Sequence, residues 1–153
     1  MEFVKKMTLD LGVCEPIVFV KGSEGKMAIG MKVFGETSYD RERHMLNAGT
    51  FTAYKHHVGE LEKLIFVDEA WMSPAREEFI QPSKDPNRVE TLIINSLNPM
   101  TQEQTMICFE MIRDSQKKLI SFKQMSLPGG STVEGRLLPA FQKGYQFVQP
   151  TTS

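Results

Sequence analysis

Two neighbouring acids, Asp68 and Glu69, lie in a segment that is otherwise apolar, from residue 64 to residue 72. A charged carboxylate in such a segment costs several kcal/mol unless it is paired, hydrogen-bonded or protonated. Whichever acid points inward therefore needs a partner, and Arg88, just before the next predicted strand, can offer a bidentate guanidinium. The alternative is an acid of raised pKa in a cleft, facing a ligand beside Trp71. The sequence favours the ion pair.

The three histidines, His44, His56 and His57, lack the spacing of a metal site. On a helix, His56 and His57 point about 100° apart and cannot both hold one ion. Asp40 and His44 share a helical face, but two ligands do not make a closed site. We therefore expect no bound metal, and we interpret His57 as a core histidine on the apolar side of its helix.

Motifs for catalysis and for cofactor binding are missing or weak. The segment 128–132 (PGGST) could present backbone N–H groups to an anion, but it lacks the Gly-Lys-Ser/Thr of a P-loop. Cys14 and Cys108 lie among apolar neighbours, which is typical of inert, reduced thiols. The chain has no Gly-x-Ser-x-Gly sequence. We expect no catalytic residue and no cofactor, so the sequence favours a protein without enzymatic activity.

Composition excludes several classes of protein. With 18 basic and 19 acidic residues the net charge is -1, so the chain lacks the surplus of Lys and Arg that a nucleic-acid binder needs. Its apolar runs are too short for a membrane-spanning helix, so neither nucleic acid nor membrane is an expected partner. Residues 1–6 lack the apolar region of a secretory signal, which, with reduced thiols, predicts a cytoplasmic protein. An apolar fraction of 41% predicts a single globular domain over 1–153.

Hydrophobic periodicity predicts an α+β fold. Hairpin connections dominate, so we expect a mainly antiparallel sheet of about six strands with two or three helices. The expected elements are a helix over 3–11, strands over 16–20 and 26–34 around a turn at 22–25, a helix from 37 or 38 to 58, strands over 64–72, 89–96, 104–112 and 119–127, and a final helix after 131.

Two finer expectations concern the helices. The capping box Ser131-x-x-Glu134 predicts the start of the final helix, which Pro139 should kink or restart. The helix ending at residue 58 should face the sheet with one wide arc. The arc contains Leu46, Gly49, Thr50, Phe51, Ala53, Tyr54, His57 and Val58.

Residues 74–88 are predicted to form a loop of about 15 residues, longer than most connections in compact domains. Three prolines and six charged residues lie in this segment, and it has no convincing periodicity. Long loops of this kind are typical of functional or mobile elements. We therefore expect the loop to be mobile in the free protein and to contact a partner.

The stretch Val67-Asp68-Glu69-Ala70-Trp71-Met72 is followed by Pro82-Ser83-Lys84-Asp85-Pro86-Asn87-Arg88-Val89-Glu90 and then by Leu92-Ile93-Ile94. This pattern resembles small uncharacterised bacterial and phage proteins in which a strand ending in Glu-Ala-Trp-Met leads through a Pro-Ser-x-x-Pro-x-Arg-x-Glu loop into a second strand. The resemblance implies no activity, but it directs attention to Glu69, Trp71, Asp85, Arg88 and Glu90. The order of the elements is similar to that of profilin-like and roadblock-like domains, by topology alone.

Our leading hypothesis is a non-catalytic module that binds a protein partner or a second copy of itself. The contact would involve the long loop and an exposed sheet edge or helix face, with Glu69, Trp71, Asp85 and Arg88 as the binding residues. The alternative is a small hydrolase in which Asp68 or Glu69 is the general base, with Arg88 as electrostatic support in a pocket beside Trp71. A deep pocket around these residues would favour the enzyme, and a shallow surface would favour the binding module.

Overall fold

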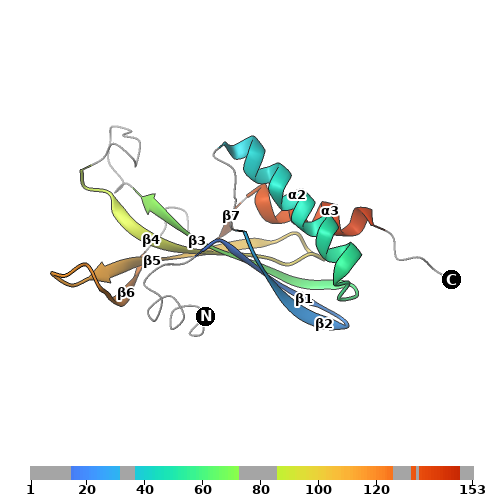
Figure 1. Cartoon of the computed structure of the whole chain (residues 1–153), viewed down its shortest axis with the longest axis horizontal. Helices are drawn as coiled ribbons and strands as arrows, with labels where there is room; N and C mark the ends of the chain where they lie inside the picture. Colours follow the sequence, from blue (N-terminus) through green and yellow to red (C-terminus); the bar gives the residue numbers. More distant parts are fainter. Residues whose placement is uncertain (1–14, 32–36, 73–85, 126–131, 134, 149–153) are drawn as a thin grey trace.

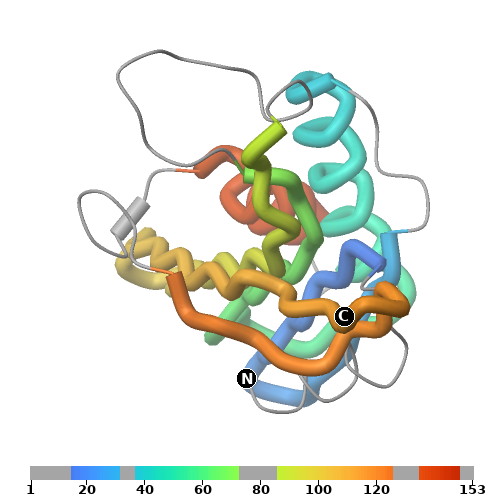
Figure 2. The backbone as a smooth tube through the Cα atoms, turned by 90° about the vertical axis from the view of Figure 1, so that its left-hand side faces the viewer, coloured from blue at the N-terminus to red at the C-terminus, as the bar shows by residue number. Residues whose placement is uncertain are grey.

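The computed structural model describes residues 15–31, 37–72, 86–125, 132–133 and 135–148 (Figure 1). In this part of the chain, one antiparallel sheet carries two helices, which confirms the α+β class. Figure 2 views the molecule at right angles to Figure 1 and shows both helices together on one side of the strands. The helix expected over 3–11, most of the loop expected over 74–88, and with it Asp85, lie outside the described residues.

The sheet has the strand order β2-β1-β3-β4-β5-β6, and all neighbouring strands are antiparallel. Each predicted strand corresponds to one of these six. A further, very short strand, β7, pairs with the beginning of β5 and was not predicted. The strands are β1 (Ile17–Gly22), β2 (Gly25–Gly30), β3 (Leu61–Met72), β4 (Val89–Leu97), β5 (Gln104–Arg113), β6 (Leu119–Met125) and β7 (Thr132–Val133).

Buried side chains lie on both faces of the sheet, because successive residues of a strand point to opposite sides. On the helix side, Leu64 and Phe66 of β3 belong to a core shared with Phe141 of the last helix. On the opposite side, Val67 of β3 packs with Leu92 of β4 in a second buried cluster. The prediction that this strand is covered on both faces is therefore confirmed.

Helix α2 (Ser38–Lys55) begins as the sequence predicts. The hydroxyl of Thr37 caps it by accepting a hydrogen bond from the backbone N–H of Asp40. Its end differs from the prediction, because the helix stops at Lys55 rather than at residue 58. The predicted apolar arc is also partly wrong, since Phe51 and Tyr54 are 54% and 76% exposed. The buried side of the helix consists of Met45, Gly49, Thr52 and Ala53.

Helix α3 (Leu137–Phe147) begins later than the capping box predicts. Thr132 and Val133 extend along β5 as β7, so the segment after Ser131 does not start a helix. Pro139 lies in the first turn of α3, which continues unbroken to Phe147, so the proline does not restart the helix. A proline is tolerated there because the first N–H groups of a helix have no partner within it.

The two helices cross in backbone contact, and a glycine from each makes this possible. A Cβ atom at Gly49 would overlap the carbonyl oxygen of Phe141, and a Cβ atom at Gly144 would overlap the carbonyl oxygen of Leu46. The hydroxyl of Thr50 donates to the carbonyl oxygens of Leu46 and Gly144, at 3.0 and 3.2 Å. Any larger side chain at either glycine would push the helices apart.

Tyr145 joins α3 to the connection between α2 and β3. Its buried hydroxyl donates to the carbonyl oxygen of Gly59 at 2.5 Å and accepts from the N–H of Val58 at 3.1 Å. The same connection holds the β1–β2 turn, where the N–H of Glu24 donates to Val58 and the N–H of Ser23 donates to Glu60. These bonds explain the early end of α2, because Val58 and Gly59 use their backbone groups outside the helix.

Side-chain amides also join α3 to the sheet through hydrogen bonds with the β4–β5 loop and with β5. The amide of the buried Gln142 donates to the carbonyl oxygen of Pro99 at 2.9 Å and accepts from the amide of Gln102 at 2.6 Å. Just before the helix, the carbonyl oxygen of Gly135 accepts from the amide of Gln104 at 3.0 Å. Buried polar side chains in this helix are thus satisfied by the loop and strand below it.

We expect Gly144→Ala and Gly49→Ala each to lower the free energy of unfolding by about 1–3 kcal/mol or more, because the added methyl group has no space between the helices. Urea unfolding followed by far-UV circular dichroism measures this loss. Gly30→Ala is the control, since no heavy atom lies within 4 Å of a Cβ built at that position. Equal stability of Gly144→Ala and Gly30→Ala would contradict the close crossing.

Candidate functional site

The predicted site residues cluster where β3 ends and β4 begins. Trp71 lies opposite Glu90, and Glu69 lies opposite Leu92. Both Glu69 and Trp71 share the sheet face that is turned away from α2 and α3, because they are two positions apart along β3. Asp68, one position away, belongs to the helix side of the sheet. The strand therefore separates the two neighbouring acids.

Trp71 is the chain's single tryptophan, and it is 48% exposed. The guanidinium carbon of Arg88 lies 4.4 Å from the centre of its ring, which is a cation–π arrangement. Such stacking holds the indole and the guanidinium in one orientation while both remain accessible. The sequence brought Trp71 and Arg88 together correctly, but it proposed a carboxylate as the partner of Arg88. That pairing remains a prediction.

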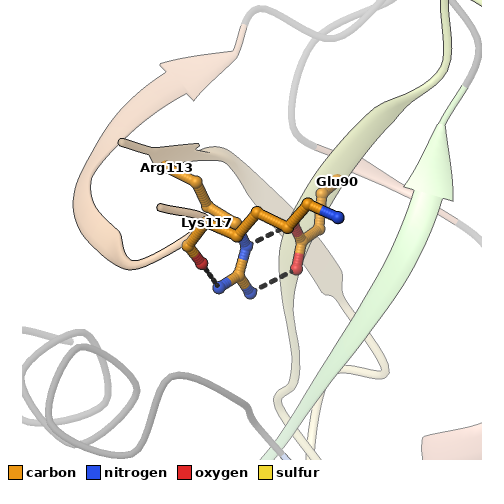
Figure 3. A network of polar contacts seen from close by, with 3 residues as sticks. All are labelled: Glu90, Arg113 and Lys117. Atoms are coloured by element: carbon orange, nitrogen blue, oxygen red, sulfur yellow. Dashed lines mark hydrogen bonds and ion pairs between the residues drawn. The ribbon is translucent and has the colours of Figure 1, made fainter. Parts of the chain in front are cut away.

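Arg113 of β5 forms an ion pair with Glu90 on this face (Figure 3). Its Nε and Nη2 atoms donate to the two carboxylate oxygens of Glu90, at 2.7 and 2.6 Å. Its Nη1 atom donates to the carbonyl oxygen of Lys117 in the β5–β6 turn, at 3.0 Å. The hydrogen bond with Glu90 raises the pKa of Arg113, and the charge of Glu69 adds to this effect. One guanidinium therefore ties together β4, β5 and the turn.

We name this surface the Trp71 strip and define it by Glu69, Trp71, Arg88, Glu90 and Arg113. The sequence analysis missed Arg113. The register of β4 against β5, which residues 98–103 connect, places Arg113 diagonally across from Glu90. The strip offers charged groups and an aromatic face, which suit binding; it contains no hydroxyl, thiol or imidazole that could serve as a nucleophile.

Asp68 lies half-buried on the helix side of β3. Burial raises the pKa of its carboxyl group. Two weaker effects oppose this rise: its Oδ1 atom accepts a hydrogen bond from the N–H of Glu69 at 2.8 Å, and the charge of Arg41 in α2 favours the carboxylate. The sequence predicted that one of the two acids in this strand would be buried, and Asp68 is half-buried. The cation whose charge acts on it is Arg41 of α2 rather than the predicted Arg88.

A hollow of about 470 Å³ lies where α2 and α3 end. Its wall includes His57, which is exposed and stacks on Tyr145 with ring centres 5.0 Å apart. The Nδ1 atom of His57 accepts from the N–H of Gly59 at 3.1 Å. The interpretation of His57 as a core histidine is therefore wrong, because α2 ends before this residue and its apolar face does not continue.

Further features of the described chain bear on the function. Within it, no group of three or more His, Cys, Asp or Glu side chains could hold a metal ion. Neither α2 nor α3 is both long and apolar enough to cross a membrane. Cys108 is buried with a free thiol, and burial raises its pKa. Cys14 lies outside the described residues.

Comparisons with known proteins give no match: no family model fits the sequence, and neither a curated protein nor a solved structure is significantly similar. The geometry of the surface is therefore the basis for interpreting it. Trp71 and the charged residues around it remain the leading candidates for a binding site.

We expect Arg113→Lys to destabilise the protein by about 1 kcal/mol, because an ammonium group cannot keep both bonds to Glu90 and the bond to the Lys117 carbonyl. Thermal or urea unfolding measures the change. Arg43→Lys is the matched control: Arg43 pairs with Asp40 at 3.8 Å on the exposed surface of α2, where the pair should contribute little. Equal losses of unfolding free energy in the two variants would show that the Glu90–Arg113 pair stabilises the protein no more than an exposed surface pair.

We expect Asp68→Asn to stabilise the protein at pH 7. The pKa of Asp68 is raised in the folded state, so its charged carboxylate lowers the free energy of unfolding at neutral pH. This loss is recovered as the pH falls through the folded-state pKa and the carboxylate becomes protonated. The difference between variant and wild type should therefore vanish as the pH falls toward the ordinary value of 3.8. Urea midpoints across this range test it, with Glu103→Gln as a control for net charge. A stability gap that widens in acid would contradict the assignment.

Proposed function

We propose that this protein is a non-catalytic module that associates with a second copy of itself through the Trp71 strip. The observation that carries the proposal is the half-exposed Trp71 with Arg88 stacked on it at 4.4 Å. Tryptophan and arginine are the residue types most enriched among those that dominate binding energy at protein interfaces. Their side chains are already stacked on each other, so less conformational entropy is lost when a partner covers them.

The charges of the strip favour a second copy as the partner. Glu69 and Glu90 contribute two negative charges, and Arg88 and Arg113 contribute two positive charges. A two-fold axis through such a balanced patch brings acids of one copy toward bases of the other, as a self-complementary interface requires. A partner with a strongly charged surface of either sign would find no net complement here.

The hydrolase alternative has less support from the geometry. It required an acid, Arg88 and Trp71 in one pocket, but Asp68, whose pKa is raised, lies on the opposite face of the sheet from Trp71. The hollows described here are lined by other residues. Glu69 shares the face of Trp71, but the side chain of Trp71 is half exposed to solvent. An exposed aromatic ring suits a protein contact better than a reaction that must exclude water.

Sedimentation velocity from about 1 to 100 µM tests the proposal, because a specific dimer has a concentration-dependent population. We expect the wild-type chain to dimerise and Trp71→Ala to weaken the dimer by about 30-fold, the effect of losing an interface residue worth about 2 kcal/mol. Arg88→Glu leaves three acids and one base in the strip, so two copies should repel one another.

Tyr54→Ala is the matched control, since Tyr54 is an exposed aromatic residue on α2, away from the strip. Circular dichroism confirms that each variant is folded before sedimentation. A wild-type chain that stays monomeric at the highest concentration, or a Trp71→Ala variant that dimerises as well as Tyr54→Ala, would show that the proposal is wrong.

A further inference from the structure

Three lysines from neighbouring strands lie in one row on the sheet face turned away from the helices. The strand register places Lys21 of β1 directly opposite Lys26 of β2 on one side and directly opposite Lys63 of β3 on the other. All three residues are exposed. Like charges in direct cross-strand register repel each other and destabilise a sheet. A bound anion would relieve this repulsion.

An apolar row lies beside the lysine row. Phe19 of β1 lies opposite Ala28 of β2 and opposite Ile65 of β3, two positions along each strand from the lysines. Together the two rows line a hollow of about 340 Å³. This volume is at the small end of the range for sites that bind small molecules. A cationic row and an apolar floor thus share one small hollow.

Among the described residues, the acids beside this lysine row are Glu62 and Glu103. Between described residues, an ion pair in the row joins Lys21 to Glu62 at 4.0 Å, and both side chains are about half exposed. An exposed pair at that distance contributes little. Glu62 and Glu103 line a neighbouring hollow with Lys63, and they mark the limit of the cationic row on that side.

We propose that this hollow, lined by Lys21, Lys26, Lys63, Phe19, Ala28 and Ile65, binds a small amphipathic anion with a carboxylate or phosphate head and a short alkyl or aryl tail. The head group lies among the ammonium groups, and the tail covers Phe19 and its neighbours. The small volume favours one amphiphile over a protein segment or a membrane surface. This site is independent of the Trp71 strip: Glu69, the residue of the strip nearest to Lys63 along β3, is roughly 20 Å away from it, at about 3.3 Å per residue.

NMR titration of the ¹⁵N-labelled full chain with decanoate, below its micelle concentration, tests the proposal. We expect saturable shifts concentrated in β1, β2 and the first half of β3. Acetate carries the head group alone and decyltrimethylammonium carries the tail with the opposite charge, so both should bind much more weakly. Vesicles of anionic phospholipid distinguish the free amphiphile from a membrane headgroup: strong binding to vesicles without binding to decanoate would overturn the proposal.

Two variants and a control make the result specific to this hollow. Lys21→Gln should weaken decanoate binding by about fivefold, because it removes one charged donor to the head group. The urea midpoint of this variant at low salt should be higher than that of the wild type, because repulsion between the lysines is relieved. Ala28→Leu should block binding by filling the floor of the hollow. Lys143→Gln, at an exposed lysine of α3, should change neither property. Unchanged affinity in both Lys21→Gln and Ala28→Leu, or equal binding of decyltrimethylammonium, would overturn the proposal.

Discussion

Helices α2 and α3 touch backbone to backbone where Gly49 and Gly144 meet, and the other features of the helix layer follow from this contact. The close approach sets the position of Tyr145, whose hydroxyl bonds the backbone of Val58 and Gly59. Val58, together with Glu60, in turn holds the β1–β2 turn through backbone hydrogen bonds. A shift of either helix would therefore disturb a loop and a hairpin as well as the core, because bonds of this kind require their partners at fixed distances.

Both described helices occupy one side of the sheet (Figure 1), and two groups of charged residues on the described strands lie on the other side. Two separate surfaces result there. Around Trp71 the charges are balanced and the aromatic ring is held by Arg88, whereas around Lys21 the charges have one sign and surround an apolar floor. The first arrangement suits a self-complementary protein contact, and the second suits a small amphipathic anion, because binding partners must match both the charge and the apolar area that they cover.

The opposite environments of Asp68 and Glu69 show how strand geometry assigns roles to neighbouring residues. Adjacent side chains of a strand point to opposite faces, so one acid lies in the less polar surroundings beneath the helices, where its pKa rises, and the other joins the open charged surface. A pattern of residue types along the chain marks both acids as unusual. The packing of the helices on one face of β3 decides which of the two is the more buried acid.

Local patterns in the sequence determined the strands, the hairpin turns, the cap of α2 at Thr37 and the α+β class, because these depend on residues close together in the chain. They also identified Trp71 and Arg88 as neighbours. Tertiary contacts decided the rest: the end of α2 depends on bonds from Tyr145, 87 residues away from Val58, and the partner of Glu90 depends on the register of β5. Thr132 and Val133 pair with β5 instead of beginning a helix, because pairing with an existing strand competes with a local helix signal. Periodicity describes one element at a time, and it contains no information on which distant backbone groups need a hydrogen-bond partner.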